Sequence, residues 1–153
     1  QRGNIRNRGI EFSFSGQVMP GLFVVVGSVY LDANVSGEEV RNGVIGKDPV
    51  GTFKLHNIAN INWNVPWHKP LTLTARFEST SNRTANAANT LVIPARSVTS
   101  LGARYKLDIG KTPLLIRANV DNIFNKFGWN VGGSGFFVPN GTRRLTLSVA
   151  ADF

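Results

Sequence analysis

Cysteine is absent from the 153 residues, which excludes both a disulfide framework and a metal site built on thiolates. Histidine occurs only at His56 and His68, and neither has a second candidate metal ligand at a matching spacing. The chain also lacks any run of about 18 or more apolar residues, which excludes a transmembrane helix. Residues 1–9 are polar and basic and do not resemble a secretory signal, so we expect a mature piece of a protein or a fragment.

Acidic residues are scarce as well: 9 Asp and Glu oppose 17 Lys and Arg, which gives a formal charge of +8. An excess of this sign raises the question of nucleic-acid binding. The basic residues are scattered, however, with one local cluster at Arg2, Arg6 and Arg8, and no nucleic-acid-reading motif accompanies them. We therefore predict no nucleic-acid partner.

Catalytic motifs are missing too. Residues 132–135 (GGSG) lack the lysine and the following helix of a phosphate-binding loop, and no nucleophile elbow surrounds any serine. The sequence therefore predicts no enzyme, no cofactor and no resident metal.

What the chain does contain is an alternation of apolar and polar residues, which is clearest in its last segment. Leu145, Leu147, Val149, Ala151 and Phe153 fall on one face of an extended strand, and the other face is mostly polar. A strand of about ten residues with lipid on one side and water on the other is typical of a membrane-spanning barrel. Packing of the terminal aromatic ring into a soluble core is the alternative.

Seven such strands are predicted, near residues 10–15, 22–34, 53–65, 71–78, 100–108, 114–121 and 143–153. Short turns at 17–21, 66–70 and 109–112 alternate with long loops at 36–51, 81–94 and 125–141. Outer-membrane barrels sort their connections in this way, with the short turns in the periplasm. Because an odd number of antiparallel strands cannot close a barrel, the predicted fold is all-β: about seven strands of a larger antiparallel transmembrane β-barrel.

Several segments resemble one family, the TonB-dependent outer-membrane receptors. Residues 119–127 (NVDNIFNKF), followed by Trp129, resemble its penultimate-strand motif, and residues 141–153 resemble its closing strand. Residues 8–11, 20–22 with 30–33, and 89–95 look like the same family in the same order. Arg96 and Ser100 depart from the pattern, because the family commonly has an aromatic residue and an aspartate there.

The resemblance implies a fold, a location and a function. Such receptors have about 22 strands around a plugged lumen, and residues 1–153 would be the last of these strands, with the plug domain absent. We expect a location in the bacterial outer membrane and TonB-dependent uptake of a ferric siderophore or a similar iron chelate. The implied partners are outer-membrane lipid, the ferric siderophore, TonB through the absent plug and N-terminal segment, and the barrel assembly machinery.

Candidate site residues follow from this reading. Trp129, Phe136 and Phe137 would offer aromatic surface to a chelator, and Arg83 or Arg96 would attract an anionic one, although loop packing explains the same residues. The resemblance also identifies the terminal-strand residues as the family's assembly signal: Leu145, Leu147, Val149, Ala151 and Phe153.

Two further groups depend on the barrel prediction. Trp63, Trp67, Tyr105 and Phe153 are candidates for an aromatic girdle at the membrane interface, with core packing as the alternative. Charged residues are expected on the lumen side: Arg76, Glu78, Arg104, Lys106, Arg117 and Asp121.

Two other architectures stay open at this point. One is a small self-contained outer-membrane barrel with a structural or adhesive role, which would recruit an eighth strand from residues 1–9 or from around Phe136. The other is a soluble β-sandwich that binds a carbohydrate or a protein.

Overall fold

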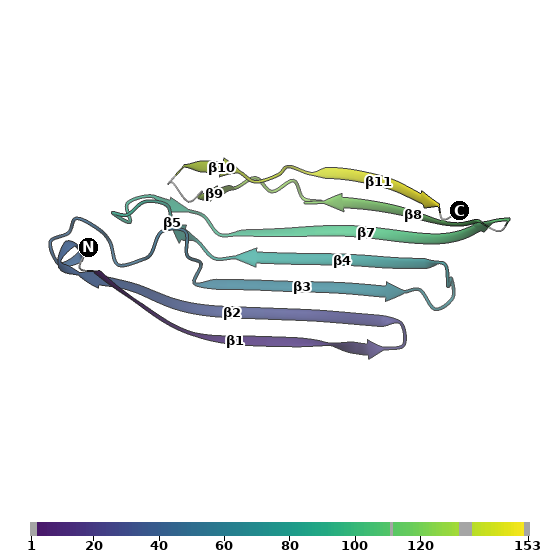
Figure 1. The fold of residues 1–153 in the computed structure, drawn as a ribbon, viewed down its shortest axis with the longest axis horizontal. Coiled ribbons are helices and arrows are strands. Elements are labelled where there is room, and N and C mark those ends of the chain that lie inside the picture. Colours follow the sequence, from purple (N-terminus) through teal and green to yellow (C-terminus); the bar gives the residue numbers. More distant parts are fainter. Residues whose placement is uncertain (1–2, 111, 132–135, 152–153) are drawn as a thin grey trace.

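A single antiparallel sheet dominates the computed structural model, which describes residues 3–110, 112–131 and 136–151. The strands lie in the order β1-β2-β3-β4-β7-β8-β11, so each is bonded to its neighbour in the meander (Figure 1). Their bounds are β1 (Gly3–Met19), β2 (Leu22–Gly37), β3 (Leu55–Asn64), β4 (Leu71–Thr80), β7 (Arg96–Ile109), β8 (Thr112–Asp121) and β11 (Arg144–Ala151). The seven predicted strands are confirmed over the described residues.

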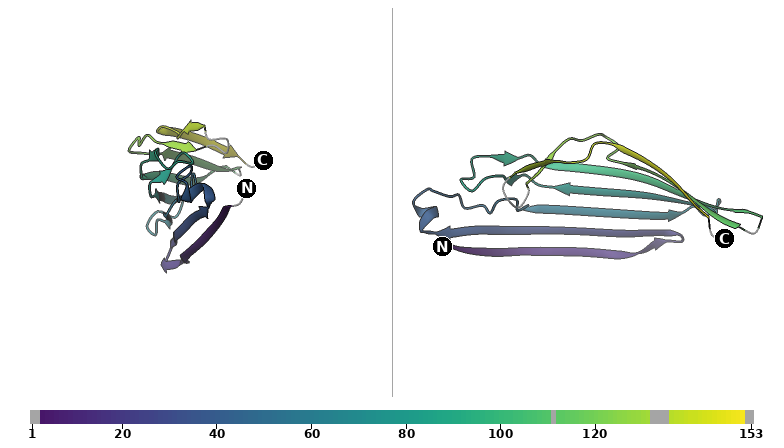
Figure 2. Two further views of the ribbon diagram at one scale, coloured as in Figure 1. Left: turned by 90° about the vertical axis from the view of Figure 1, so that its left-hand side faces the viewer. Right: turned by 45° about the horizontal axis from the view of Figure 1, so that its top comes forward.

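The three short turns lie at one end of the sheet and the three long connections at the other (Figures 1 and 2). The turn between β1 and β2 requires Gly21, whose φ is 77° and whose Cβ, if present, would lie 2.7 Å from the Asn64 carbonyl oxygen. The sorting of connections by length, expected from the sequence, is therefore observed.

The long connections contain small elements that the sequence did not predict. They are α1 (Glu38–Arg41), β5 (Arg83–Thr84), β6 (Val92–Ile93), β9 (Trp129–Val131) and β10 (Phe137–Pro139). Elements of two to four residues are too short to show a period in the sequence. Over the described residues, no helix is long and apolar enough to cross a membrane.

The proposed sources of an eighth strand are wrong. Gly3 to Gly9 are already part of β1, where they pair with Gly37 to Leu31 of β2. Phe136 precedes β10, which pairs with β9 in a separate two-stranded hairpin. Within the described residues β1 and β11 are paired on one side only, so the sheet has two open edges.

One face of the sheet is apolar and uncovered. The register places Val24, Ile61, Ala75, Leu101, Val120 and Leu145 in one row across six strands. Directly paired residues point to the same face, and side chains on it remain open, with Leu145 73% and Leu147 70% exposed. Among the described residues only Ala33, Val65, Ala85 and Ile93 form a buried apolar core. A soluble sandwich needs a second layer over this face, and the described part of the chain does not supply one.

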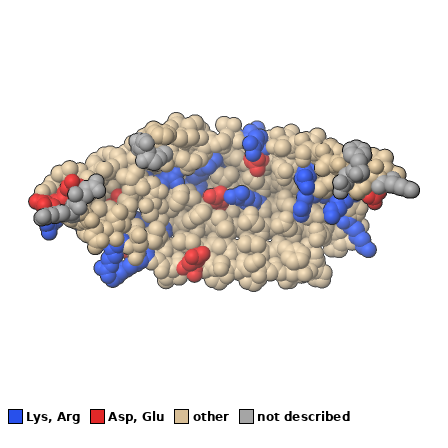
Figure 3. Space-filling model, in the orientation of Figure 1, with Lys and Arg blue, Asp and Glu red and all other residues tan. Residues whose placement is uncertain are grey.

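The opposite face carries the six charged side chains that were predicted for it. Arg104 pairs with Arg117, and Arg144 pairs with Asp121, all on the face away from the apolar row. Figure 3 shows such charged side chains over the middle of the strands. Some form ion pairs there, at 3.3 Å between Arg76 and Glu78 and at 3.1 Å between Arg144 and Asp121.

Strand β2 departs from this division because both of its faces are apolar. Leu22, Val24 and Val26 belong to the apolar face, and Phe23 and Val25 lie on the charged one. Phe23 remains 46% exposed there. The sequence of β2 therefore does not alternate between apolar and polar residues over Leu22 to Val26.

Aromatic side chains gather at the turn end. The rings of Trp63 and Trp67 meet edge to face with centroids 5.3 Å apart, and Tyr105 lies 5.4 Å from the ring of His68. Phe153, the fourth predicted member of the girdle, lies outside the described residues. The role of the other three at a membrane interface stays a prediction.

The two faces predict opposite responses to a positive charge. In the intact protein in lipid bilayers, Leu147→Arg should lower the free energy of unfolding by about 2 to 4 kcal/mol, because it places a guanidinium in hydrocarbon. Thr146→Arg, one residue away on the charged face, should change it by less than about 1 kcal/mol. Urea titrations of both variants provide the measurement, and equal losses would contradict the assignment of the faces.

Candidate ligand site at the long-loop end

Three loops meet at one end of the sheet. The first loop (residues 38–54) joins β2 to β3, the second (81–95) joins β4 to β7, and the third (122–143) joins β8 to β11. Their contacts determine which of the predicted site residues come together.

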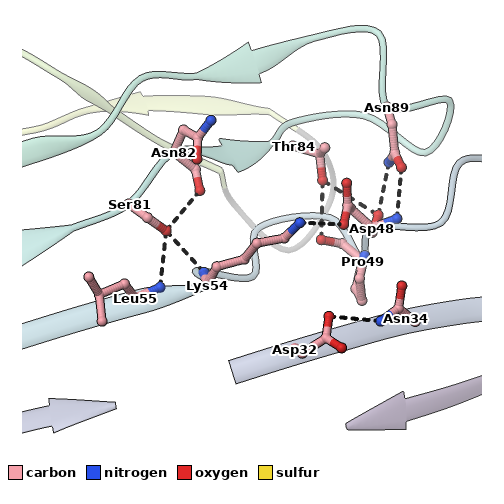
Figure 4. Close-up of polar contacts among 10 residues, drawn as sticks. All are labelled: Asp32, Asn34, Asp48, Pro49, Lys54, Leu55, Ser81, Asn82, Thr84 and Asn89. Carbon is pink, nitrogen blue, oxygen red and sulfur yellow. Dashed lines mark hydrogen bonds and ion pairs between the residues drawn. The ribbon is translucent and has the colours of Figure 1, made fainter. Parts of the chain in front are cut away.

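The first two loops are joined by backbone and amide hydrogen bonds (Figure 4). The side-chain oxygen of Asn89 accepts from the Asp48 amide, and its Nδ2 donates to the Asp48 carbonyl, both at 2.8 Å. Asn89 has a φ of 57°, a conformation that asparagine tolerates better than most residues. The amides of Gly46 and Gly51 also donate across, to the carbonyls of Ala87 and Thr84, at 2.7 and 2.9 Å.

Side chains strengthen the same junction (Figure 4). The buried Thr84 hydroxyl donates to the Pro49 carbonyl at 3.2 Å, and within the first loop Lys54 forms an ion pair with Asp48 at 3.3 Å. Where the loops leave the sheet, the Ser81 hydroxyl oxygen accepts from the amides of Lys54 and Leu55. The first and second loops therefore form one unit.

The third loop is organised by Asn122, which is buried and has a φ of 52°. Its Nδ2 donates to the carbonyls of Lys126 and Gly141 at 3.0 and 3.1 Å, and its Oδ1 accepts from the Lys126 amide at 2.8 Å. One side chain therefore holds the two ends of the loop together. The sequence motif contained Asn122, but only the structure shows that the side chain has this structural role.

Arg83 lies where all three loops meet. Its guanidinium is 4.3 Å from the ring centroid of Phe53 in the first loop, and its Nη2 donates to the Trp129 carbonyl and to Asn130 Oδ1 in the third, both at 2.8 Å. Its Nε is buried without an acceptor among the described residues. Removal of the guanidinium from water lowers the pKa of Arg83 below its ordinary value.

Arg96 makes a second connection to the third loop. Its Nε and Nη2 both donate to the Lys126 carbonyl, at 3.3 and 3.0 Å. Two arginine side chains thus hold the third loop, in addition to the Ile123 amide, which donates to the Thr99 carbonyl of β7 at 2.9 Å.

A cavity of about 500 Å³ opens between the loops and the charged face of the sheet. Of the predicted ligand residues, Arg83, Arg96 and Trp129 line it together, with Phe53, Glu78 and Phe127 among the other lining residues. Such a cavity, with two guanidinium groups and three aromatic rings, suits an anionic ligand that has flat or aromatic groups.

The remaining predicted residues lie outside this cavity. Phe137 lines an adjacent apolar cavity of about 320 Å³, which Trp129 shares, and its ring meets that of Trp129 edge to face at 6.4 Å. Phe136 is exposed and lines neither cavity. Sequence reasoning missed Phe53 and Phe127, because nothing in their local pattern shows that the first and third loops approach each other.

Comparison with known proteins shows which family has this fold. The family model described as "TonB dependent receptor-like, beta-barrel" matches residues 1–123. The chain belongs to this family. The resemblance seen in the sequence is thereby confirmed, and the protein is an outer-membrane protein of Gram-negative bacteria.

Individual proteins that the chain resembles are consistent with this family. The chain is 32% identical to the ferrichrome receptor FcuA of Yersinia enterocolitica, over 99% of this chain and 20% of that protein. It is 30% identical to BauA, the ferric preacinetobactin receptor of Acinetobacter baumannii, with a TM-score of 0.89 over 99% of this chain and 23% of BauA. The pyoverdine outer membrane receptor FpvA of Pseudomonas aeruginosa, 19% identical over 97% of this chain and 22% of its own, shares the fold with a TM-score of 0.77.

The chain therefore spans about a fifth of the length of the curated relative that it matches, and it is part of a larger barrel. The self-contained small barrel and the soluble sandwich are both wrong for this chain. The two open edges of the sheet fit this conclusion, since lipid does not tolerate unpaired backbone groups.

Asn122 provides a test of how the third loop is held. In the intact protein, Asn122→Ala should speed proteolysis within the loop about tenfold or more, because two carbonyls and one amide lose their partner and alanine is strained at φ 52°. Asn122→Gly loses the same hydrogen bonds without the backbone strain, so its loop should be cleaved at a rate between those of the wild type and of Asn122→Ala. Cleavage of both variants at the wild-type rate would contradict the role of the side chain.

Proposed function

We propose that the protein to which this chain belongs takes up a ferric siderophore or a similar iron chelate across the outer membrane in a TonB-dependent manner. Membership of the family supports this, as do the printed descriptions of the relatives as ferrichrome and ferric preacinetobactin receptors. In this proposal residues 1–153 form the last strands of the barrel wall, and a plug domain and a TonB-engaging segment belong to other parts of the protein.

The observation that carries the proposal is the cavity at the long-loop end. It brings two guanidinium groups and the rings of Phe53, Phe127 and Trp129 to one place, at the mouth of the charged face of the sheet. A ferric chelate with negative oxygen donors would be attracted by Arg83 and Arg96 and would pack its organic part on the rings. The cavity contributes recognition, and we assign no chemical step to this chain.

The proposal predicts a loss of affinity that depends on ligand charge. In the full-length receptor, Arg83→Gln combined with Arg96→Gln should raise the Kd for a triscatecholate ferric complex of negative charge by about tenfold or more. The Kd for a neutral trihydroxamate ferric complex should change much less, because this ligand has no negative charge for the two arginines to pair with. Binding titrations monitored by iron-dependent fluorescence quenching give both constants.

Arg117→Gln is the matched control, since Arg117 lies on the charged face and does not line the cavity. If neither ferric complex binds the wild-type receptor, or if the double variant binds both as tightly as the wild type does, the proposed role of the cavity is wrong.

We also propose that the last strand presents a signal to the barrel assembly machinery. The alternating residues Leu145, Leu147, Val149 and Ala151 all lie on the apolar face of β11 and are exposed, which leaves this row free for contact during assembly. Phe153, the last predicted member of the signal, lies outside the described residues.

This second proposal is tested in cells. Phe153→Ser should lower the amount of folded receptor in the outer membrane several-fold without changing the Kd of the molecules that do assemble. Phe136→Ser, which changes an exposed phenylalanine in the third loop, is the control and should leave the amount unchanged. Quantitative immunoblots of heat-modifiable receptor measure both, and a normal level of the Phe153→Ser protein would count against the signal.

A further inference from the structure

The loop end contains two kinds of attachment. The first and second loops are joined through their backbones and through both polar atoms of the Asn89 amide. The third loop is held to the second loop through the guanidinium of Arg83. It is held to β7 through the guanidinium of Arg96 and, at its start, through the amides of Asn122 and Ile123, which donate to the Ser100 hydroxyl and the Thr99 carbonyl. Among the hydrogen bonds of the described residues, no backbone bond joins the third loop to the first or the second. The hydrogen bonds that join the third loop directly to the second therefore come from Arg83, a side chain that lines the cavity.

The two arginines differ in how fully their donors are used. Arg96 directs Nε and Nη2 at a single acceptor, the Lys126 carbonyl, so the edge of its guanidinium that carries these donors is filled. Arg83 binds both Trp129 and Asn130 through Nη2 alone. The neighbouring Nε of Arg83 is buried and unpaired.

The two acceptors that bind Arg83 also form weaker hydrogen bonds than an anion would. Both are neutral amide oxygens, whereas an oxyanion binds a guanidinium through two parallel charge-assisted hydrogen bonds that are roughly twice as strong as neutral ones. An oxyanion that bound the Nε–Nη2 edge of Arg83 would satisfy the unpaired Nε and would compete with the third loop for one of the two Nη2 hydrogens.

We propose that Arg83 is a ligand-exchanged latch: a carboxylate, phosphate or catecholate oxygen anion that enters the cavity takes over its guanidinium and releases the third loop from the first two. This rests on the proposed function in one respect, because the anion that arrives there in the cell would be part of the iron chelate. Arg83 thereby couples occupancy of the cavity to the position of the loop. Arg96, with its edge filled, keeps its hold on Lys126.

Hydrogen–deuterium exchange of the full-length receptor, with inorganic phosphate as the probe and chloride at equal ionic strength as the control, tests the latch. In the wild type, phosphate should raise the exchange rate of the β9 and β10 amides about tenfold, because their hairpin opens more often once it loses one hydrogen bond to the charged Arg83. The amides of Gly46 and Gly51 should keep their protection, because their acceptors lie in the second loop.

Two variants complete the test. Arg83→Gln should give fast exchange in β9 and β10 without phosphate and no further response to it. Arg96→Gln, which removes the filled guanidinium, should still respond to phosphate. Protection of the Gly46 and Gly51 amides reports that each variant has folded.

The outcomes separate the latch from the proposed function. Unchanged or slower exchange of β9 and β10 in wild-type receptor with phosphate would overturn the latch, as would an unaltered phosphate response in Arg83→Gln. Failure of ferric chelates to bind would overturn the proposed function instead, since no chelate takes part in the exchange measurement.

Discussion

Interstrand hydrogen bonding is the constraint on which the rest of this structure depends. A sheet of one layer has no interior of its own, so its backbone groups are satisfied only by neighbouring strands. The long meander from β1 to β11 meets this need along most of its length, except at its two edges and where β2 continues past the start of β3. Because strand pairing holds the backbone in place, the side chains of one face can be apolar and meet hydrocarbon, and those of the other face can be charged. The loop end, with its cavity, is then positioned by the strand ends.

Much of the fold was predictable because a period of two residues is visible without any tertiary information. Residues 143–153 already displayed the apolar row of β11, and the lengths of the connections already showed which end carries the loops. Strand ends were less predictable. Gly3 to Gly9 join β1 although their sequence is polar, because in this part of the hairpin both faces meet water and alternation no longer reports on burial.

The candidate site was only partly predictable. The sequence allowed three cavity residues to be identified: Trp129, Arg83 and Arg96. Each is an aromatic or cationic residue in or beside a long loop that is rich in glycine, asparagine and serine. Their meeting in one cavity with Phe53 and Phe127 depends on the bonds of Asn89 and Asn122, and both asparagines require a left-handed backbone. No periodicity encodes such bonds, since each is a single contact between residues far apart in the chain. Phe136 looked equivalent to Phe137 in the sequence, and only the pairing of β10 with β9 separates them.

The length of the first hairpin has a consequence for what the cell presents to its surroundings. Strand β3 begins at Leu55, opposite Tyr30, whereas β1 and β2 continue to Gly3 and Gly37. At about 3.3 Å per residue, the seven further pairs carry this hairpin roughly 23 Å past the start of β3. The first loop lies against this projecting part, since the amides of Leu31 and Val35 donate to the carbonyls of Lys54 and Lys47. The rim of the sheet at the long-loop end is therefore uneven, and it rises farthest along β1 and β2.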